Sequence, residues 1–170
     1  SLGFVFWPQS PRFVTPEAAA AIGATVPPFV IRVGVFVEAS RDELLRTADT
    51  AGLDVLQLHG PEPAEALVAL PRRTLKALRV GPGFRADDAL PYAKAGAGLL
   101  VDTHRPEAPG GTGAAFDWTL VEGLSQRVPF LVLAGGLRPD NVAEAIAIVR
   151  PHAVDVSSGV ESSPGRKDEG

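Results

Sequence analysis

The chain has 170 residues, a hydrophobic fraction of 45% and a formal net charge of −4 at pH 7. These values are typical of one globular domain with a sizeable core. No apolar run reaches the roughly 18 residues that span a bilayer, and no signal peptide opens the chain, so we expect no membrane partner. The acidic balance argues against nucleic acid. The densest basic group, Arg72, Arg73 and Lys76, is explained by a solvated face.

The chain contains no cysteine and only three histidines, which are scattered. The lack of cysteine excludes disulfides, thiolate zinc sites and a thiol nucleophile within these residues, and it fits a cytoplasmic protein. The histidines do not follow metal-ligand spacing, and the carboxylates do not cluster. We therefore expect neither a metal site nor a cofactor.

Apolar runs typical of buried strands alternate with stretches of helical period along the whole chain. We expect strands at residues 2–7, 29–37, 54–58, 73–80, 98–102, 128–134 and 153–157. We expect helices at residues 17–23, 40–51, 61–70, 86–94, 117–124 and 139–149. Thr15 is expected to cap the first helix, Ser40 and Glu43 form a capping box for the second, and Gly52 ends it.

Seven unbroken apolar strands separated by amphipathic helices indicate a parallel sheet covered on both faces. An open doubly wound sheet is the alternative, but the regular repeat and the absence of G-x-G-x-x-G favour a (β/α)8 TIM barrel. Since seven strands do not close an eight-stranded barrel, we expect residues 1–170 to be a single barrel domain without its first strand-helix unit. The alternative is a fragment. Because residue 1 is Ser, we expect the natural start to lie upstream.

Glycine-rich turns follow the last two expected strands, where barrels of this class bind phosphate. Gly135 and Gly136 follow one strand, and Ser157 and Gly159 belong to the turn after the other. Residues without a Cβ let backbone N–H groups approach an anion closely. Either turn alone could simply be tight, but the pair favours a phosphate site.

Three further polar residues lie after strand ends, where a barrel carries its active face. Asp102 could be a general acid whose pKa is raised by partial burial, or a turn-capping aspartate. Arg12 could hold a substrate carboxylate or be solvated. His59 could position substrate or remain a neutral imidazole. The glycine run at residues 110–113 is better explained as a mobile lid than as a nucleotide loop.

Taken in order, the motifs at the strand ends resemble the phosphoribosylanthranilate isomerase family. The matching strings are GFVFWPQSPR at 3–12, RVGVFV at 32–37, LQLHG at 56–60, LLVDTHRPEAPGGTGAAFDW at 99–118, LAGGLRPDNV at 133–142 and VDVSSGVESSPGRKD at 154–168. The GGTG-x-x-FDW and DVSSGVE-x-x-PG-x-KD strings are the most specific. The resemblance covers the chain from end to end.

The resemblance implies an aldose-ketose isomerase, an intramolecular oxidoreductase of tryptophan biosynthesis. Its Amadori rearrangement converts N-(5-phosphoribosyl)anthranilate into 1-(2-carboxyphenylamino)-1-deoxyribulose 5-phosphate. Asp102 aligns with the general acid, Arg12 with the residue that holds the anthranilate carboxylate, and Asp155 with a contact to sugar hydroxyls. His59 matches a histidine near the substrate. The AGGL and SSG turns (Gly135, Gly136, Ser157 and Gly159) are expected to bind the phosphate.

The family's general base is a cysteine in a K-x-C-G motif on the first strand, which this sequence lacks. We expect that cysteine upstream, and a closing helix beyond Gly170. The alternative for these residues is a non-catalytic sugar-phosphate-binding barrel or an inactive fragment. A pentose-phosphate epimerase would require metal-ligand histidines that are not visible. The expected partner is the small-molecule substrate, and the protein is expected to be a monomer or a homodimer.

Overall fold

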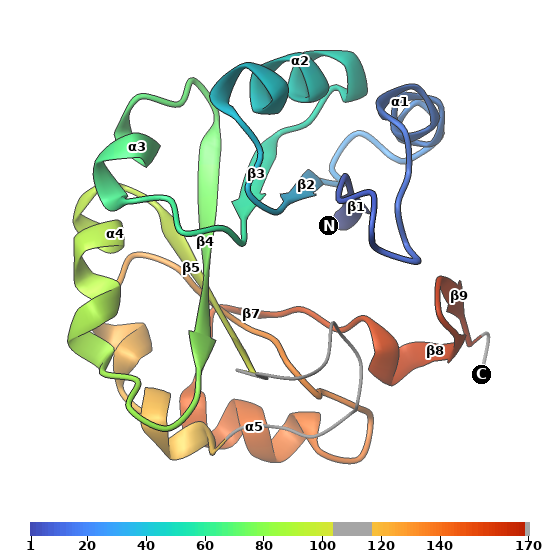
Figure 1. Cartoon of the computed structure of the whole chain (residues 1–170). Coiled ribbons are helices and arrows are strands. Elements are labelled where there is room, and N and C mark those ends of the chain that lie inside the picture. Colours follow the sequence, from blue (N-terminus) through green and yellow to red (C-terminus); the bar gives the residue numbers. More distant parts are fainter. Residues whose placement is uncertain (104–116, 169–170) are drawn as a thin grey trace. The chain divides into compact units, whose positions relative to one another are not determined.

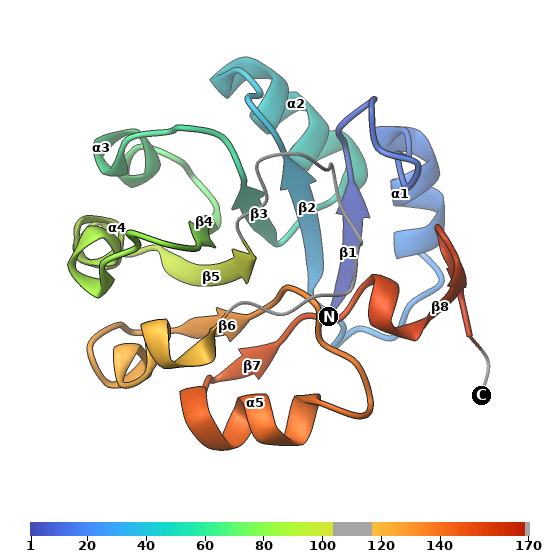
Figure 2. The same cartoon turned by 60° about the horizontal axis from the view of Figure 1, so that its bottom comes forward.

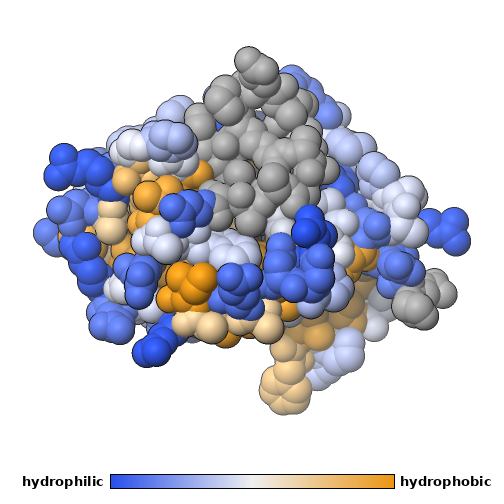
Figure 3. All heavy atoms as spheres, turned by 90° about the horizontal axis from the view of Figure 1, so that it is seen from below, coloured by the Kyte–Doolittle hydropathy of each residue, from blue (hydrophilic) through white to orange (hydrophobic). Residues whose placement is uncertain are grey.

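The computed structural model describes residues 1–103 and 117–168 (Figure 1). The chain forms two compact units, Ser1–Lys76 and Ala77–Gly170, and each is considered by itself. The expected lid at residues 110–113 lies outside the described residues. Within them, no helix is long and apolar enough to cross a membrane. On the face drawn in Figure 3, hydrophilic residues predominate and apolar residues form small groups between them.

In the first unit, parallel strands pair in chain order and are separated by helices. The elements are β1 (Leu2–Val5), α1 (Pro16–Gly23), β2 (Arg32–Phe36), α2 (Arg41–Ala51), β3 (Val55–Leu58), α3 (Ala64–Val68) and the start of β4 (Arg73–Val80). Helices α1 and α2 contact each other beside these strands (Figure 2). This is the expected alternation of strand and helix.

The helix boundaries of the first unit follow from local capping. The Thr15 side chain accepts a hydrogen bond from the Ala18 N–H at the start of α1. Ser40 does the same for the Glu43 N–H at the start of α2, which ends at Gly52 with a left-handed φ of 62°. The expected caps at Thr15 and Ser40 and the expected helix end at Gly52 are confirmed, and each satisfies backbone groups that a helix end leaves unpaired. Of the expected capping box, the bond from the Glu43 N–H to Ser40 is present.

The second unit repeats this plan with shorter elements. They are η1 (Ala86–Ala89), α4 (Leu90–Lys94), β5 (Gly98–Thr103), η2 (Trp118–Val121), η3 (Leu124–Gln126), β6 (Leu131–Leu133), α5 (Val142–Val149), β7 (Ala153–Val154), η4 (Ser158–Val160), β8 (Glu161–Ser163) and β9 (Arg166–Lys167). Strands β5, β6 and β7 pair in parallel in chain order, and β8 and β9 form an antiparallel hairpin. Helix α5 lies along β7 (Figures 1 and 2).

The core of the second unit lies between its strands and its helices. Leu99 and Val101 of β5 and Leu133 of β6 are fully buried there, together with Ala145 and Val149 of α5. Side chains alternate along a strand, so residues one position away point to the opposite face of the sheet. This alternation decides which residues at the strand ends lie on the face away from the helices.

The expected helix at residues 117–124 is wrong. The segment forms two 3-10 turns, η2 and η3, instead of an α-helix. The Asp117 side chain accepts hydrogen bonds from both the N–H and the hydroxyl of Thr119, which favours a tight turn over a helix. Glu122 then leaves helical geometry with ψ 134°, and Gly123 takes a left-handed φ of 73°. Neither residue continues a helix.

Several boundaries also differ from the sequence-based expectation, mostly because the elements are shorter than expected. The strand expected at residues 29–37 begins only at Arg32, and Phe29 is 98% exposed. The helix expected at residues 139–149 begins at Val142, because the preceding residues form a hydrogen-bonded turn. The β8–β9 hairpin was not expected. Strand β7 ends at Val154, before the polar residues that follow it.

Candidate active site

Hydrogen bonds between β5, β6 and β7 set the level at which their carboxyl ends lie. Val101 pairs with Leu133, and Leu133 pairs with Val154. The Ala134 N–H donates to the Val101 carbonyl and the Asp155 N–H to the Leu133 carbonyl, both at 2.9 Å. The ladder therefore continues one residue past each short strand.

Asp102, Ala134 and Asp155 consequently occupy one row across three neighbouring strands. They alternate with Val101 and Leu133, which face the helices, so the row lies on the opposite face of the sheet. Adjacent strands lie about 4.8 Å apart, so the two aspartates are separated by about 10 Å at the backbone. The small Ala134 side chain stands between them.

The two aspartates differ in their surroundings. Asp102 is half-buried at the end of β5. Protein atoms around the Asp155 carboxyl raise its pKa above the ordinary value by desolvation, and the positive charge of Lys167 opposes this rise. A carboxyl whose pKa is raised keeps its proton to higher pH and can donate a hydrogen bond there.

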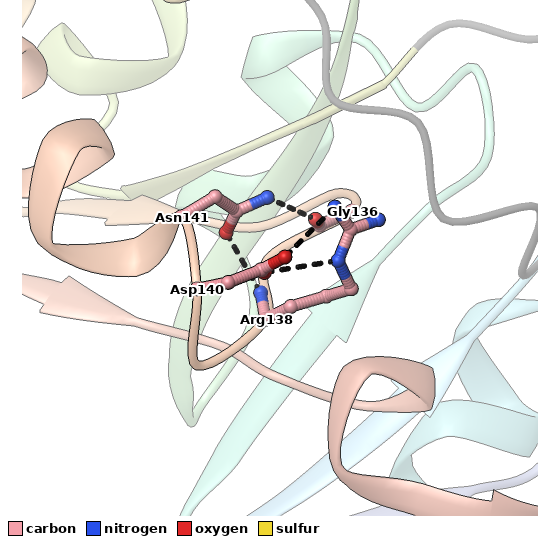
Figure 4. Close-up of polar contacts among 4 residues, drawn as sticks. All are labelled: Gly136, Arg138, Asp140 and Asn141. Carbon is pink, nitrogen blue, oxygen red and sulfur yellow. Dashed lines mark hydrogen bonds and ion pairs between the residues drawn. The ribbon is translucent and has the colours of Figure 1, made fainter.

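Polar contacts between its own residues fix the conformation of the turn after β6 (Figure 4). Gly135 and Gly136 have left-handed φ values of 85° and 69°, which a residue with a Cβ rarely adopts. The Asn141 amide donates to the Gly136 carbonyl at 2.9 Å and accepts from the Arg138 N–H at 2.8 Å. Arg138 also pairs with Asp140 at 3.1 Å and lowers the pKa of that carboxyl.

The turn after β7 packs directly against the turn after β6. A Cβ built on Gly159 would lie 1.8 Å from the Leu137 carbonyl oxygen, a distance that real atoms do not allow. Leu137 itself is buried in the core of the unit. Both expected phosphate-binding turns are therefore next to each other, and Gly159 is the residue that permits their contact.

Arg12 lies in the first unit, in a compact turn after β1. The Arg12 N–H donates to the Ser10 hydroxyl at 3.1 Å, and the Ser10 N–H donates to the Trp7 carbonyl at 2.9 Å. The chain then returns to β1, where the Val14 N–H bonds to Val5 at 3.0 Å. Arg12 is half-buried.

His59 follows β3 and is paired with the last buried polar residue of that strand. A hydrogen bond of 2.8 Å joins the Gln57 amide nitrogen to Nε2 of His59. The His59 N–H also donates to the Phe36 carbonyl at 2.9 Å. Both bonds hold the ring at the end of the strand.

Lys76 corrects the expectation that the basic group at residues 72–76 is a solvated face. Arg72 and Arg73 fit that expectation, but Lys76 is only 2% exposed. Its ammonium pairs with Glu62 at 2.7 Å and donates to the carbonyls of Leu58, at 3.4 Å, and Gly60. These groups belong to the turn that carries His59. The apolar neighbours Leu75 and Ala77, between which Lys76 lies in β4, were the signal that could have identified it.

Asp102, Asp155 and both glycine-rich turns thus come together within the second unit, while Arg12 and His59 belong to the first. Among the described residues, no cluster of three or more histidine, cysteine or acidic side chains could hold a metal ion. What the second unit offers chemically is a carboxyl group beside two adjacent turns of backbone donors.

The seven strands that alternate with helices, and polar groups at the strands' carboxyl ends, define a (β/α)8 barrel protein. A model of the N-(5'-phosphoribosyl)anthranilate (PRA) isomerase family matches residues 1–170. An N-(5'-phosphoribosyl)anthranilate isomerase of Geobacter sp. (strain M21) is 54% identical over 99% of this chain and 81% of its own length. The chain therefore belongs to the PRA isomerase family, as the sequence motifs predicted.

Solved structures agree with this assignment. The crystal structure of phosphoribosyl anthranilate isomerase from Thermotoga maritima is 45% identical, with a TM-score of 0.85 over 98% of this chain and 80% of the other. A structure of the enzyme in complex with reduced 1-(o-carboxyphenylamino)-1-deoxyribulose 5-phosphate has a TM-score of 0.81, with 42% identity over 98% of this chain and 79% of the other. Monomers generated from the dimeric Thermotoga maritima enzyme also score 0.81, at 41% identity over the same shares.

Replacing Lys76 by Met should lower the free energy of unfolding by about 3–5 kcal/mol, because Glu62 and two carbonyls lose their buried cation. Glu62→Gln should cost less, about 1–3 kcal/mol, since the amide oxygen still accepts from the ammonium. Urea denaturation measures both. Arg73→Met on the same strand is the control and should stay within about 0.5 kcal/mol. Equal losses of unfolding free energy in Lys76→Met and Arg73→Met would contradict a buried ion pair between Lys76 and Glu62.

Gly159→Ala should destabilise the protein by about 1–3 kcal/mol, because the new methyl group forces the two turns apart. The affinity for inorganic phosphate should fall as well, measured by calorimetry. Gly3→Ala is the matched control, since a Cβ there meets no atom within 4 Å. Unchanged stability and phosphate affinity in Gly159→Ala would show that the turns are not in tight contact.

Proposed function

We propose that this protein catalyses the isomerisation of N-(5-phosphoribosyl)anthranilate to 1-(2-carboxyphenylamino)-1-deoxyribulose 5-phosphate, a step of tryptophan biosynthesis. The observation that carries the proposal is the family match along the whole chain. The reaction is an Amadori rearrangement that moves hydrogen within one molecule. It needs an acid, a base and an anchored phosphate, and it needs no cofactor.

Asp102 is our candidate for the general acid. Its carboxyl would protonate the ring oxygen of the furanose, so that the ring opens to a protonated Schiff base. Removal of the C2 proton by a base then gives an enolamine, which tautomerises to the aminoketone. The position of Asp102 at the carboxyl end of β5 supports this role, because the active face of a barrel lies at the carboxyl ends of its strands.

The substrate phosphate is proposed to bind the two glycine-rich turns, Gly135 with Gly136 and Ser157 with Gly159. Two observations support this phosphate site: Gly159 packs directly on Leu137, and Gly135 and Gly136 have left-handed φ values. Backbone N–H groups in such turns form concave anion sites. Asp155 would then contact the sugar hydroxyls from the same row as Asp102.

Arg12 and His59 are proposed as contacts to the anthranilate half of the substrate. A guanidinium in a fixed turn suits a planar carboxylate, which it can bind through two parallel hydrogen bonds. The half-burial of Arg12 and the hydrogen bonds that hold His59 support these roles. In this scheme His59 would position the substrate and would not remove its proton.

A second candidate function is sugar-phosphate binding without turnover. It is favoured by one observation, the absence of cysteine from the 170 residues, because the base of the family reaction is a cysteine. A general base contributes about 10²–10⁴ in rate. Binding of the reduced product analogue without conversion of substrate would support this candidate over catalysis.

The test is conversion of N-(5-phosphoribosyl)anthranilate by the purified protein, followed chromatographically. Asp102→Asn should lower kcat by about 10²–10⁴, since it removes the acid and keeps the shape. Calorimetric binding of the reduced product analogue should stay within a few-fold, and circular dichroism should be unchanged. Asp88→Asn, on η1, is the control. Normal turnover by Asp102→Asn would remove Asp102 from the role of acid.

We further propose that the protein is a homodimer. Phe29 is 98% exposed and Ile31 is 48% exposed, beside an open hollow of about 600 Å³ lined by residues 28–31, 53–55 and 71–73. A large aromatic residue on the surface next to a hollow suits a two-fold contact in which each copy fills the other's hollow. The dimeric form of the Thermotoga maritima relative supports the choice of partner.

Phe29→Asp should therefore convert a dimer into a folded monomer, because the contact loses its aromatic ring and a carboxylate buried there would lose its hydration. Light scattering coupled to size-exclusion chromatography measures the mass. Ile22→Asp is the control, since Ile22 is also exposed but belongs to α1, outside the hollow. A wild-type protein that is monomeric at micromolar concentration would refute the proposal.

A further inference from the structure

Lys167, in the β8–β9 hairpin, reaches back to the turn that follows β7. Its ammonium donates to the Ser157 carbonyl at 3.1 Å and lies 3.4 Å from the Glu161 carboxylate. The Glu161 side chain is only 4% exposed, whereas the Lys167 side chain is 57% exposed. One cation therefore bridges a buried carboxylate and the backbone of the proposed phosphate-binding turn.

The hairpin fixes Lys167 in register with this turn. Glu161 pairs with Lys167 across the antiparallel ladder, and the Asp168 N–H donates to the Val160 carbonyl at 2.9 Å. The hairpin follows directly on the turn, since β8 begins at Glu161. The turn is thus held from one side by the hairpin and from the other by the contact between Gly159 and Leu137.

The bond to the Ser157 carbonyl has a consequence for the next N–H group. The carbonyl of Ser157 and the N–H of Ser158 belong to one planar trans peptide, so they point in opposite directions. A cation that holds the carbonyl on the hairpin side therefore turns the N–H away from the hairpin. It also polarises the peptide and strengthens the N–H as a donor.

We propose that Lys167 is a positioning residue for the substrate phosphate, which it serves by orienting the Ser158 N–H and by adding positive charge behind the turn. This inference rests on the proposed function, in which the turn binds the phosphate. Lys167 touches neither the ring oxygen nor C2 in this scheme, so it acts on binding and not on proton transfer.

The effect of Lys167 on binding is measured apart from its effect on folding. The Lys167 side chain is more than half exposed, so replacing it opens no cavity, and thermal unfolding measures the cost of leaving the buried Glu161 carboxylate without its cation. The preceding residue, Arg166, carries the same charge on the same short strand, and its side chain points to the other face because side chains alternate. It is the matched control for a loss of one positive charge.

The experiment compares Lys167→Met, Lys167→Gln, Lys167→Arg and Arg166→Met in the purified protein. Calorimetry measures the affinity for the reduced product analogue and for inorganic phosphate, and steady-state kinetics measures KM and kcat separately. Thermal unfolding checks that each variant folds. Lys167→Gln keeps a neutral donor and provides the comparison if Lys167→Met is unstable.

Lys167→Met should weaken both ligands about tenfold and raise KM similarly, with kcat changed less than about threefold. Lys167→Arg should recover most of the affinity, and Arg166→Met should stay within about twofold. Wild-type affinity in Lys167→Met, or equal losses in Lys167→Met and Arg166→Met, would overturn the inference alone. A wild-type protein that binds neither the analogue nor phosphate would overturn the proposed function, and the inference with it.

Discussion

The parallel ladder through β5, β6 and β7 is the constraint on which the second unit depends. Its register brings Asp102, Ala134 and Asp155 to one level, although 53 positions of sequence number separate the first from the last. Because neighbouring strands lie about 4.8 Å apart, this level is wide enough for a small sugar between the two carboxyl groups. The small residue between them keeps that space free of side-chain atoms. A slip of one residue would turn both aspartates toward the helices.

In both units a lysine donates hydrogen bonds to carbonyl groups in the turn that follows a strand. Where a parallel strand ends, its last carbonyls lose their partners, and a buried carbonyl without a hydrogen bond is costly. In the first unit the Lys76 ammonium bonds to the Leu58 and Gly60 carbonyls and to Glu62. In the second, Lys167 bonds to the Ser157 carbonyl and to Glu161. In each case a lysine and a glutamate fix the turn that follows a strand.

The sequence predicted the order and type of nearly all the elements, because their signals are local. The caps at Thr15 and Ser40 and the stop at Gly52 act within one helical turn, so neighbouring residues suffice to recognise them. The helix predicted at residues 117–124 was wrong because other local interactions compete with the helical pattern there. Its apolar spacing suits a helix, but the Asp117 side chain and Gly123 favour two short turns, and helical period alone carries no information about that competition.

Some residues of the candidate site could be predicted from the sequence, and others could not. Gly135, Gly136, Ser157 and Gly159 could be selected from sequence, since two glycine-rich turns after the last two strands together favour a phosphate site. The close contact that requires a glycine at position 159 could not be predicted from the sequence, because it depends on the Leu137 carbonyl in another turn. Lys76 was misjudged for a similar reason. A lysine beside two arginines resembles a solvated face until the fold places a glutamate and two carbonyls around its ammonium.

By itself, the sequence determined the barrel class, the family and the positions of the polar residues at the strand ends. All of these are properties of residue type and spacing along the chain. Only the tertiary structure decided which of those residues are neighbours, which lysines are buried or bridging, and which apolar residues remain outside the core. These are properties of distances between residues remote in sequence. They depend on strand register and on packing, which no local pattern fixes.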